Sequence, residues 1–112
     1  MAKENDLRSG QTGMLLLRLL TDADLYGYEL LLELRDRSNG VFDLKGGTLY
    51  PLLQKLEHLG WISSYEAIAG AGRMRRYYHL TSGGRAALIQ QAAEWTQYAT
   101  TVDQLLGPEL AR

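Results

Sequence analysis

The last third of the chain carries apolar side chains at heptad spacing, and this pattern limits the possible folds more than any other. The repeat, in alternating steps of four and three residues, comprises Leu88, Ala92, Trp95, Ala99, Val102 and Leu106. It predicts one long helix that is capped at Thr81 or Ser82 and stopped by Gly107-Pro108. At ~1.5 Å per residue this helix is roughly 37 Å long, which is longer than a small domain needs.

We call these six repeat residues the seam. A long apolar helix needs a partner, so the seam predicts a two-fold homodimer in which the same helix of a second copy packs against it. Ile89, Tyr98 and Leu105 widen the apolar face. The alternative is that the helix packs back on its own domain, where the apolar run from Met14 to Leu20 also needs a partner.

A chain of 112 residues without cysteine fits one domain with a modest core and has no disulfide framework. Apolar residues make up 46% of it, which indicates globular rather than disordered material. The polar start MAKENDLRSG lacks the apolar stretch of a signal peptide, and the most apolar run is too short to cross a bilayer. We therefore expect a soluble, cytoplasmic protein with no membrane contact.

Two helices are predicted in the first forty residues. The first covers about residues 11–21, and its side chains are apolar almost all round, so we expect other elements on several sides of it. The second opens with Asp24 as its N-cap and runs from Leu25 or Tyr26 to about Ser38. Beyond it, residues 41–45 (VFDLK) alternate apolar and polar side chains, which predicts one short strand.

A third helix follows Gly46-Gly47 and carries leucines on one face. With Thr48 as its N-cap, Pro51 falls at the third helical position, where the missing N–H costs little. Gly60 ends this helix.

Two β-rich runs, 61–68 and 75–81, flank the glycine-containing loop AGAGRM and predict a β-hairpin. The resulting order is typical of a winged helix-turn-helix, in which the third helix enters the DNA major groove and the hairpin, called the wing, lies along the phosphates or in the minor groove. We expect an α+β fold, mainly α. Residues 1–80 form the winged helix-turn-helix and residues 81–112 the dimerisation helix, within a single compact domain.

The charge distribution supports a surface that binds a polyanion. From Lys45 to Arg85 the chain has six basic and two acidic residues, a net charge of +4, whereas the remainder carries −5. The alternative is that these cations are simply solvated. The residues expected to contact DNA are Lys45, Gly47, Thr48, Tyr50, Gln54, Lys55, His58, Arg73, Arg75 and Arg76. Because neighbouring strand residues face opposite ways, only one of Arg75 and Arg76 is expected to act together with Arg73.

Trp95 lies in the middle of the seam among small residues. Its large ring either fills the dimer core or leaves space for a planar aromatic ligand, with Ala92 and Ala99 beside it.

No pattern of an enzyme or a cofactor site is present. His58 and His79 lie on a helix and a strand with no cysteine and no evident acidic partner, which argues against a zinc site. The glycine loop lacks the lysine of a phosphate-binding loop, and no nucleophile elbow is found.

Three stretches, LYGYELLLEL, GGTLYPLLQKLEHLGWI and GRMRRYYHLTSGGRAAL, resemble the PadR-like transcriptional repressors. With the tryptophan-bearing last helix, the resemblance covers about residues 10–106, and the single C-terminal helix is similar to that of the small subfamily. It implies a winged-helix homodimer that binds a pseudo-palindromic operator. Tyr50 and Lys55 match motif positions of the recognition helix. Trp95 matches the position at which some multidrug-responsive members stack flat aromatic drugs, while other members respond to phenolic acids.

Two hypotheses remain at this point. The first is a dimeric, sequence-specific DNA-binding repressor that a small aromatic ligand at the dimer interface releases. The second is a winged-helix adaptor that binds proteins and not DNA.

Overall fold

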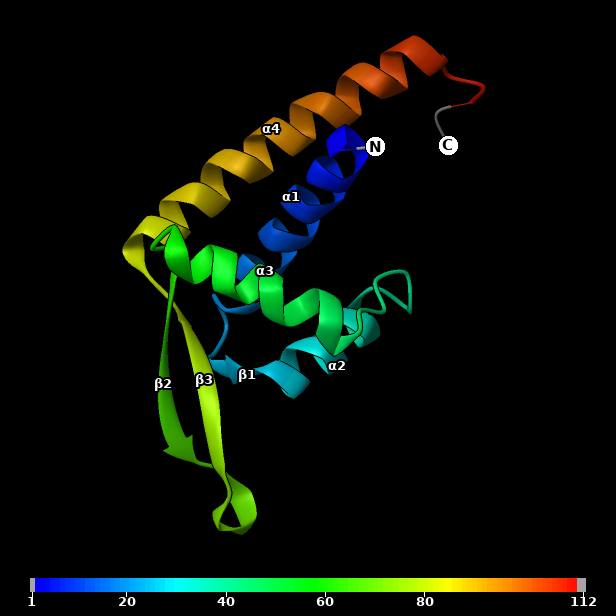
Figure 1. Ribbon diagram of the computed structural model, residues 1–112. Coiled ribbons are helices and arrows are strands. Elements are labelled where there is room, and N and C mark those ends of the chain that lie inside the picture. Colours follow the sequence, from blue (N-terminus) through cyan, green and yellow to red (C-terminus); the bar gives the residue numbers. More distant parts are fainter. Residues whose placement is uncertain (1, 111–112) are drawn as a thin grey trace.

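The computed structural model describes residues 2–110, which form helices around one end of a small antiparallel sheet (Figure 1). The elements are α1 (Ala2–Leu19), β1 (Leu25–Tyr26), α2 (Gly27–Arg37), α3 (Gly46–His58), β2 (Ile62–Ile68), the short 3-10 turn η1 (Gly70–Gly72), β3 (Met74–Leu80) and α4 (Ser82–Leu106). The strand order is β1-β3-β2, with both pairings antiparallel. The expected class, mainly helical with a winged helix-turn-helix and a long last helix, is confirmed.

The core lies where α1, α2 and α3 meet the base of the sheet. Its fully buried side chains are Leu16, Leu17, Leu30, Leu49, Leu53 and Ile62. The leucine spacing of α3 places four leucines on the buried side, and the opposite side of that helix is left to solvent. Burial of these side chains stabilises each helix, which would be marginal in isolation at this length.

The prediction of a short strand at residues 41–45 is wrong. That segment is irregular, and Val41 is 76% exposed. The third strand is instead Leu25–Tyr26, which pairs with Tyr78 and Tyr77 at the free edge of β3. Because these two residues are extended, α2 begins at Gly27 with Tyr26 as its N-cap, and Asp24 does not cap it.

Two other helix starts also differ from expectation. Helix α1 begins at Ala2, not near residue 11, because extending an existing helix adds one hydrogen bond for each residue fixed. Helix α3 begins at Gly46, since the carbonyl of Lys45 accepts from the N–H groups of Thr48 and Leu49, both at 3.0 Å. Thr48 is therefore inside the helix, and Pro51 occupies the sixth helical position rather than the third.

The wing and the last helix follow the prediction closely. Strands β2 and β3 pair from Ile62↔Leu80 to Ile68↔Met74. Helix α4 takes Thr81 as its N-cap, whose hydroxyl accepts from the N–H of Gly84 at 3.0 Å and donates to the carbonyl of Gly60 at 2.7 Å. Helix α4 then runs alongside α1 (Figure 1). In the described part of the chain, none of the helices combines the length and apolar character that spanning a membrane requires.

Candidate nucleic-acid interface

The solvent side of α3 presents the polar residues that the sequence singles out. Lys45, Gly47, Thr48, Tyr50, Gln54, Lys55 and His58 are all exposed. The Tyr50 ring leans over the first residue of α2, where a β-carbon on Gly27 would overlap the phenol group. Glycine at position 27 is thus what allows Tyr50 to lie between the two helices of the helix-turn-helix.

The three wing arginines have three different surroundings. The Nη2 atom of Arg76 lies 3.8 Å from Oε2 of Glu57 on α3, and the same carboxylate oxygen accepts a 2.6 Å hydrogen bond from Ser64. Arg75 points to the other face of the sheet, where its guanidinium lies 5.2 Å from the centre of the Tyr26 ring. Arg73 is exposed, and the described residues provide it with no ion pair or side-chain hydrogen bond. Arg73 is consequently the wing cation most available to a phosphate.

Arg76 and α3 border one hollow on the solvent side of the molecule. Its lining residues are Tyr50, Pro51, Gln54, Glu57, Arg76 and Tyr78. This hollow joins the polar side of α3 to the base of the wing, so the two elements form one continuous surface.

Asp24 anchors the outer face of the wing. The sequence predicts this residue as the N-cap of α2, but its carboxylate contacts β2 and β3 instead. Asp24 accepts a 2.7 Å hydrogen bond from the Tyr65 hydroxyl on β2, and its other oxygen lies 2.9 Å from Nδ1 of His79 on β3. The expectation that His79 has no acidic partner is therefore wrong. On the same face, Tyr77 of β3 stacks on Tyr65 of β2 with ring centres 5.7 Å apart, and this contact helps to hold the two strands together.

The anchor makes folding stability depend on pH. Burial alone would raise the pKa of Asp24, but the hydrogen bonds from Tyr65 and His79 outweigh it and hold that pKa below its ordinary value. A carboxyl group whose pKa is lower in the folded state contributes stability above its unfolded pKa of about 4, and this contribution is lost as the pH falls through the folded pKa.

We expect Asp24→Asn to be less stable than the wild type at pH 6, and the difference to narrow as the pH falls below about 4. Urea unfolding midpoints measured across this range check the expectation. Asp103→Asn, which removes an exposed carboxylate on α4, serves as the control. A difference for Asp24→Asn that stays constant with pH would contradict the anchoring role.

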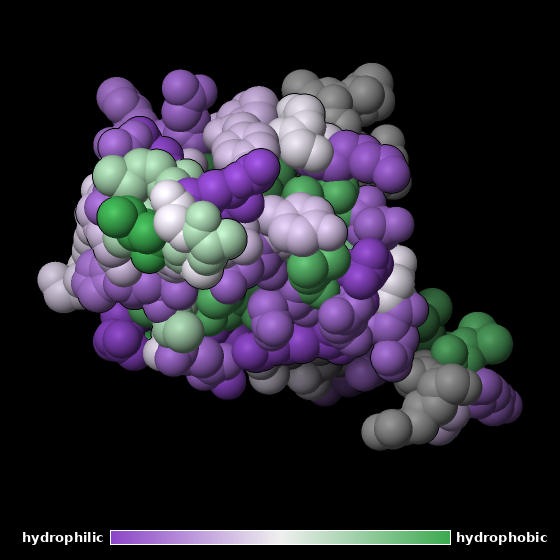
Figure 2. Space-filling model, turned by 90° about the horizontal axis from the view of Figure 1, so that it is seen from below, coloured by the Kyte–Doolittle hydropathy of each residue, from purple (hydrophilic) through white to green (hydrophobic). Residues whose placement is uncertain are grey.

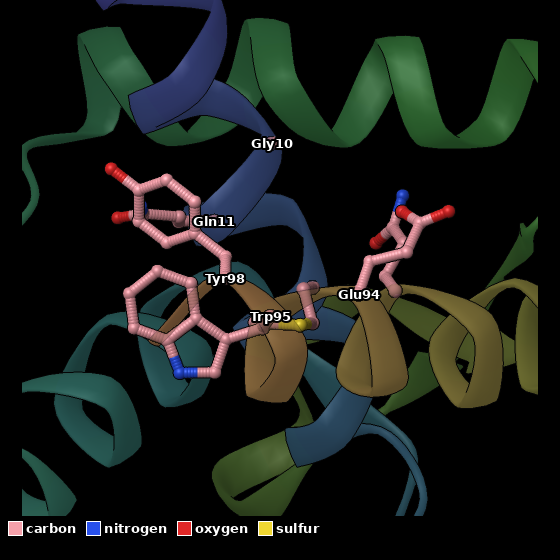
Figure 3. Close-up of a pocket in the computed structure, with 7 residues that line it drawn as sticks. Gly10, Gln11, Glu94, Trp95 and Tyr98 are labelled. Carbon is pink, nitrogen blue, oxygen red and sulfur yellow. The ribbon is translucent and has the colours of Figure 1, made fainter. Parts of the chain in front are cut away.

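A second site lies between α1 and α4, where a pocket of about 270 Å³ opens beside Trp95 (Figure 3). It is lined by Gly10, Gln11, Met14, Gln91, Glu94, Trp95 and Tyr98. The rings of Trp95 and Tyr98 lie side by side, with centres 5.7 Å apart and planes inclined by 33°. Ala92 and Ala99, which the sequence places with Trp95, do not line this pocket.

The rest of α4 leaves much of its apolar surface uncovered in the single protomer. Trp95 is 42% exposed and Leu106 46%, while Leu105 reaches 84%. Leu88 packs against the core, Ala92 is exposed, and Ala99 and Val102 are half-buried. Helix α4 therefore contacts its own domain through α1 and still presents an apolar strip to solvent.

Comparison with known proteins decides the family. The profile of the Transcriptional regulator PadR-like family matches residues 16–90, which include the whole helix-turn-helix and the wing. The chain belongs to this family. Transcriptional regulator Rv3488 from Mycobacterium tuberculosis is 36% identical to this chain over 81 residues, which are 72% of each chain.

Solved structures agree with the assignment to the PadR-like family. A transcriptional regulator from Clostridium thermocellum superposes with a TM-score of 0.81 at 28% identity, covering 91% of this chain and 99% of that one. A PadR family transcriptional regulator from Eggerthella lenta gives a TM-score of 0.78 at 32% identity, covering 96% and 91%. PadR-like proteins are DNA-binding transcriptional regulators and not enzymes, and the same holds for this chain.

Proposed function

We propose that this PadR-like protein is a cytoplasmic, dimeric repressor that binds a pseudo-palindromic DNA operator. The observation that carries the proposal is the continuous surface formed by the polar side of α3 and the base of the wing. In this proposal residues 1–80 make the DNA-binding region, with α3 in the major groove, and residues 81–112 supply the dimerisation helix.

Each part of the surface has a distinct role in the proposed complex. Gln54 and Lys55 on the solvent side of α3 can hydrogen-bond to base edges, whereas Gly47 at its start allows close approach of a phosphate to the backbone. Arg73 contacts phosphate directly. Arg76 lies on the side of the wing that is proposed to face DNA, but it pairs with the carboxylate of Glu57. We therefore expect a weaker phosphate contact from Arg76 than from Arg73.

Arg73→Ala is expected to weaken DNA binding and to flatten its dependence on salt. Each phosphate contact contributes about 0.9 to the slope of log K against log salt concentration, so each protomer that loses Arg73 lowers the slope by about one. Titrations of the duplex upstream of the protein's own gene at several salt concentrations measure this slope. Arg18→Ala removes an equal charge beside Asp22, outside the proposed surface, and leaves the slope unchanged. An unchanged slope for Arg73→Ala would remove the wing tip from the DNA contacts.

We further propose that a planar aromatic cation occupies the pocket beside Trp95 and releases the operator. Two features of the lining support a cation with a hydrogen-bond donor. Glu94 supplies a carboxylate, and Oε1 of Gln91 is buried without a hydrogen-bond partner among the described residues. The Trp95 and Tyr98 rings supply the stacking surface.

Titration with ethidium, a planar aromatic cation, is expected to quench the fluorescence of Trp95. Trp61 also emits, so Trp95→Phe serves as the control and should abolish most of the quenching. Glu94→Gln keeps the shape of the pocket and should weaken binding about tenfold if the carboxylate attracts the cation. Equal quenching in the wild type and in Trp95→Phe would place the ligand elsewhere.

A further inference from the structure

The tip of the wing is apolar on a surface that otherwise contacts a polyanion. Ile68 and Met74 form the last cross-strand pair of the hairpin and are 70% and 61% exposed. Between them Ala69, Gly70, Ala71 and Gly72 carry at most a methyl group, and Arg73 is the only charged residue from 67 to 74. Exposed isoleucine and methionine at a protruding turn gain nothing from folding, so a contact outside the protomer would explain them.

The alternation of side chains along β2 and β3 places Ile68 and Met74 on one face of the hairpin. On β3, Met74 shares its face with Arg76 and Tyr78, and on β2, Ile68 shares its face with Glu66, which lies opposite Arg76, and with Ser64. This is the face on which Arg76 and Ser64 both reach Glu57 of α3. The apolar pair therefore continues the proposed DNA surface beyond the last ion pair. Figure 2 looks onto the wing from below and shows apolar surface beside hydrophilic side chains on this side of the molecule.

The turn itself is tight and made of small residues, and the N–H of Ala69 donates to the carbonyl of Arg73 at 2.7 Å across it. Ala71 and Gly72 have positive φ angles of 67° and 75°, which let the chain reverse within a few small residues. The B-DNA minor groove is about 6 Å wide and attracts arginine where it narrows. Minor-groove proteins commonly insert isoleucine or methionine between base steps and kink the duplex.

We propose that Ile68 and Met74 form an apolar wedge that enters the minor groove beside Arg73 and bends the operator. This inference rests on the proposed DNA binding and adds a shape-reading contact to it. Residues 67–74 carry one cation, Arg73, and no carboxylate, while Glu66 on the same face lies opposite Arg76; this positive tip favours DNA over a protein surface as the occupant. Specificity at the wing would then come from how easily a base step unstacks.

The test uses a duplex selected from random sequences by the full-length wild type and carrying a fluorophore at each end. Energy transfer between the ends reports the bend, and titration reports affinity. For the double variant Ile68→Ser/Met74→Ser we expect a smaller bend and an affinity reduced roughly tenfold to a hundredfold, with the salt slope unchanged because no charge is lost. Val41→Ser, an equally exposed apolar residue on the loop between α2 and α3, controls for the loss of apolar surface.

The outcomes separate the wedge from the proposed function. A double variant that bends the duplex as much as the wild type overturns the wedge, and so does a wild type that binds the duplex without bending it. A wild type that selects no duplex at low salt overturns the DNA-binding proposal itself, and the wedge with it. Thermal melting of the double variant within a few degrees of the wild type verifies that both proteins are folded.

Discussion

Gly84→Ala is expected to lower the free energy of unfolding by about 3 kcal/mol. Gly84 lies in the first turn of α4, where a β-carbon would overlap the carbonyl oxygen of Trp61 and crowd Leu80. The obstacle is backbone, which cannot rotate away as a side chain can. The first turn of α4 must therefore shift, and its hydrogen bonds to the base of the wing weaken.

The neighbouring glycine provides a matched control for that experiment. At Gly83 the atom nearest to an added β-carbon is the Gly60 carbonyl oxygen at 3.5 Å, an ordinary contact. Gly83→Ala should therefore be stabilising by up to about 1 kcal/mol, since alanine favours the helix. Urea unfolding of both variants measures the difference. Equal midpoints for the two variants would show that α4 does not pack against Trp61 as described.

Leu106→Glu is expected to weaken the proposed homodimer at least about 100-fold, which corresponds to about 2.7 kcal/mol. Leu106 is the last seam residue and is 46% exposed in the protomer, so the change should leave the fold intact. In a two-fold dimer each seam receives a carboxylate that must be desolvated or face its symmetry mate. Sedimentation at micromolar concentrations measures the dimer directly, and the loss of paired half-site contacts should reduce operator affinity with it.

A charge on the other side of α4 should have no such effect. Gln104 is exposed and lies far around the helix from the seam, so Gln104→Glu adds the same charge at the same end. We expect its dimer affinity to remain within a few-fold of the wild type. A Leu106→Glu protein as dimeric as Gln104→Glu would show that the seam is not the interface.

The parts of the fold that follow from local patterns were predictable from the sequence. The leucines of α3 and the heptad spacing of α4 each define a face, and two β-rich runs around a glycine turn define the wing. Periodicity identifies which residues are buried, and caps such as Thr81 locate helix ends. The exposed polar side of α3 follows from the same pattern.

The features that depend on pairing across the chain were not predictable. Leu25–Tyr26 becomes a strand only because β3 offers it a free edge, while VFDLK alternates without any strand to pair with. Asp24 is separated by 41 residues from Tyr65 and by 55 from His79, so its role as an anchor has no local signal. The three arginines differ because strand register brings Arg76 to Glu57 and Arg75 to Tyr26, leaving Arg73 to solvent.

The central claim is that two copies of this chain place two α3 helices on one face of a duplex. Hydroxyl-radical footprinting of the wild type on DNA selected from random sequences tests it most directly. We predict two protected blocks related by dyad symmetry, with centres about 34 Å apart or a multiple of that distance. A single protected block, or no protection at low salt, would contradict the claim, and the latter would favour a winged-helix adaptor that binds protein.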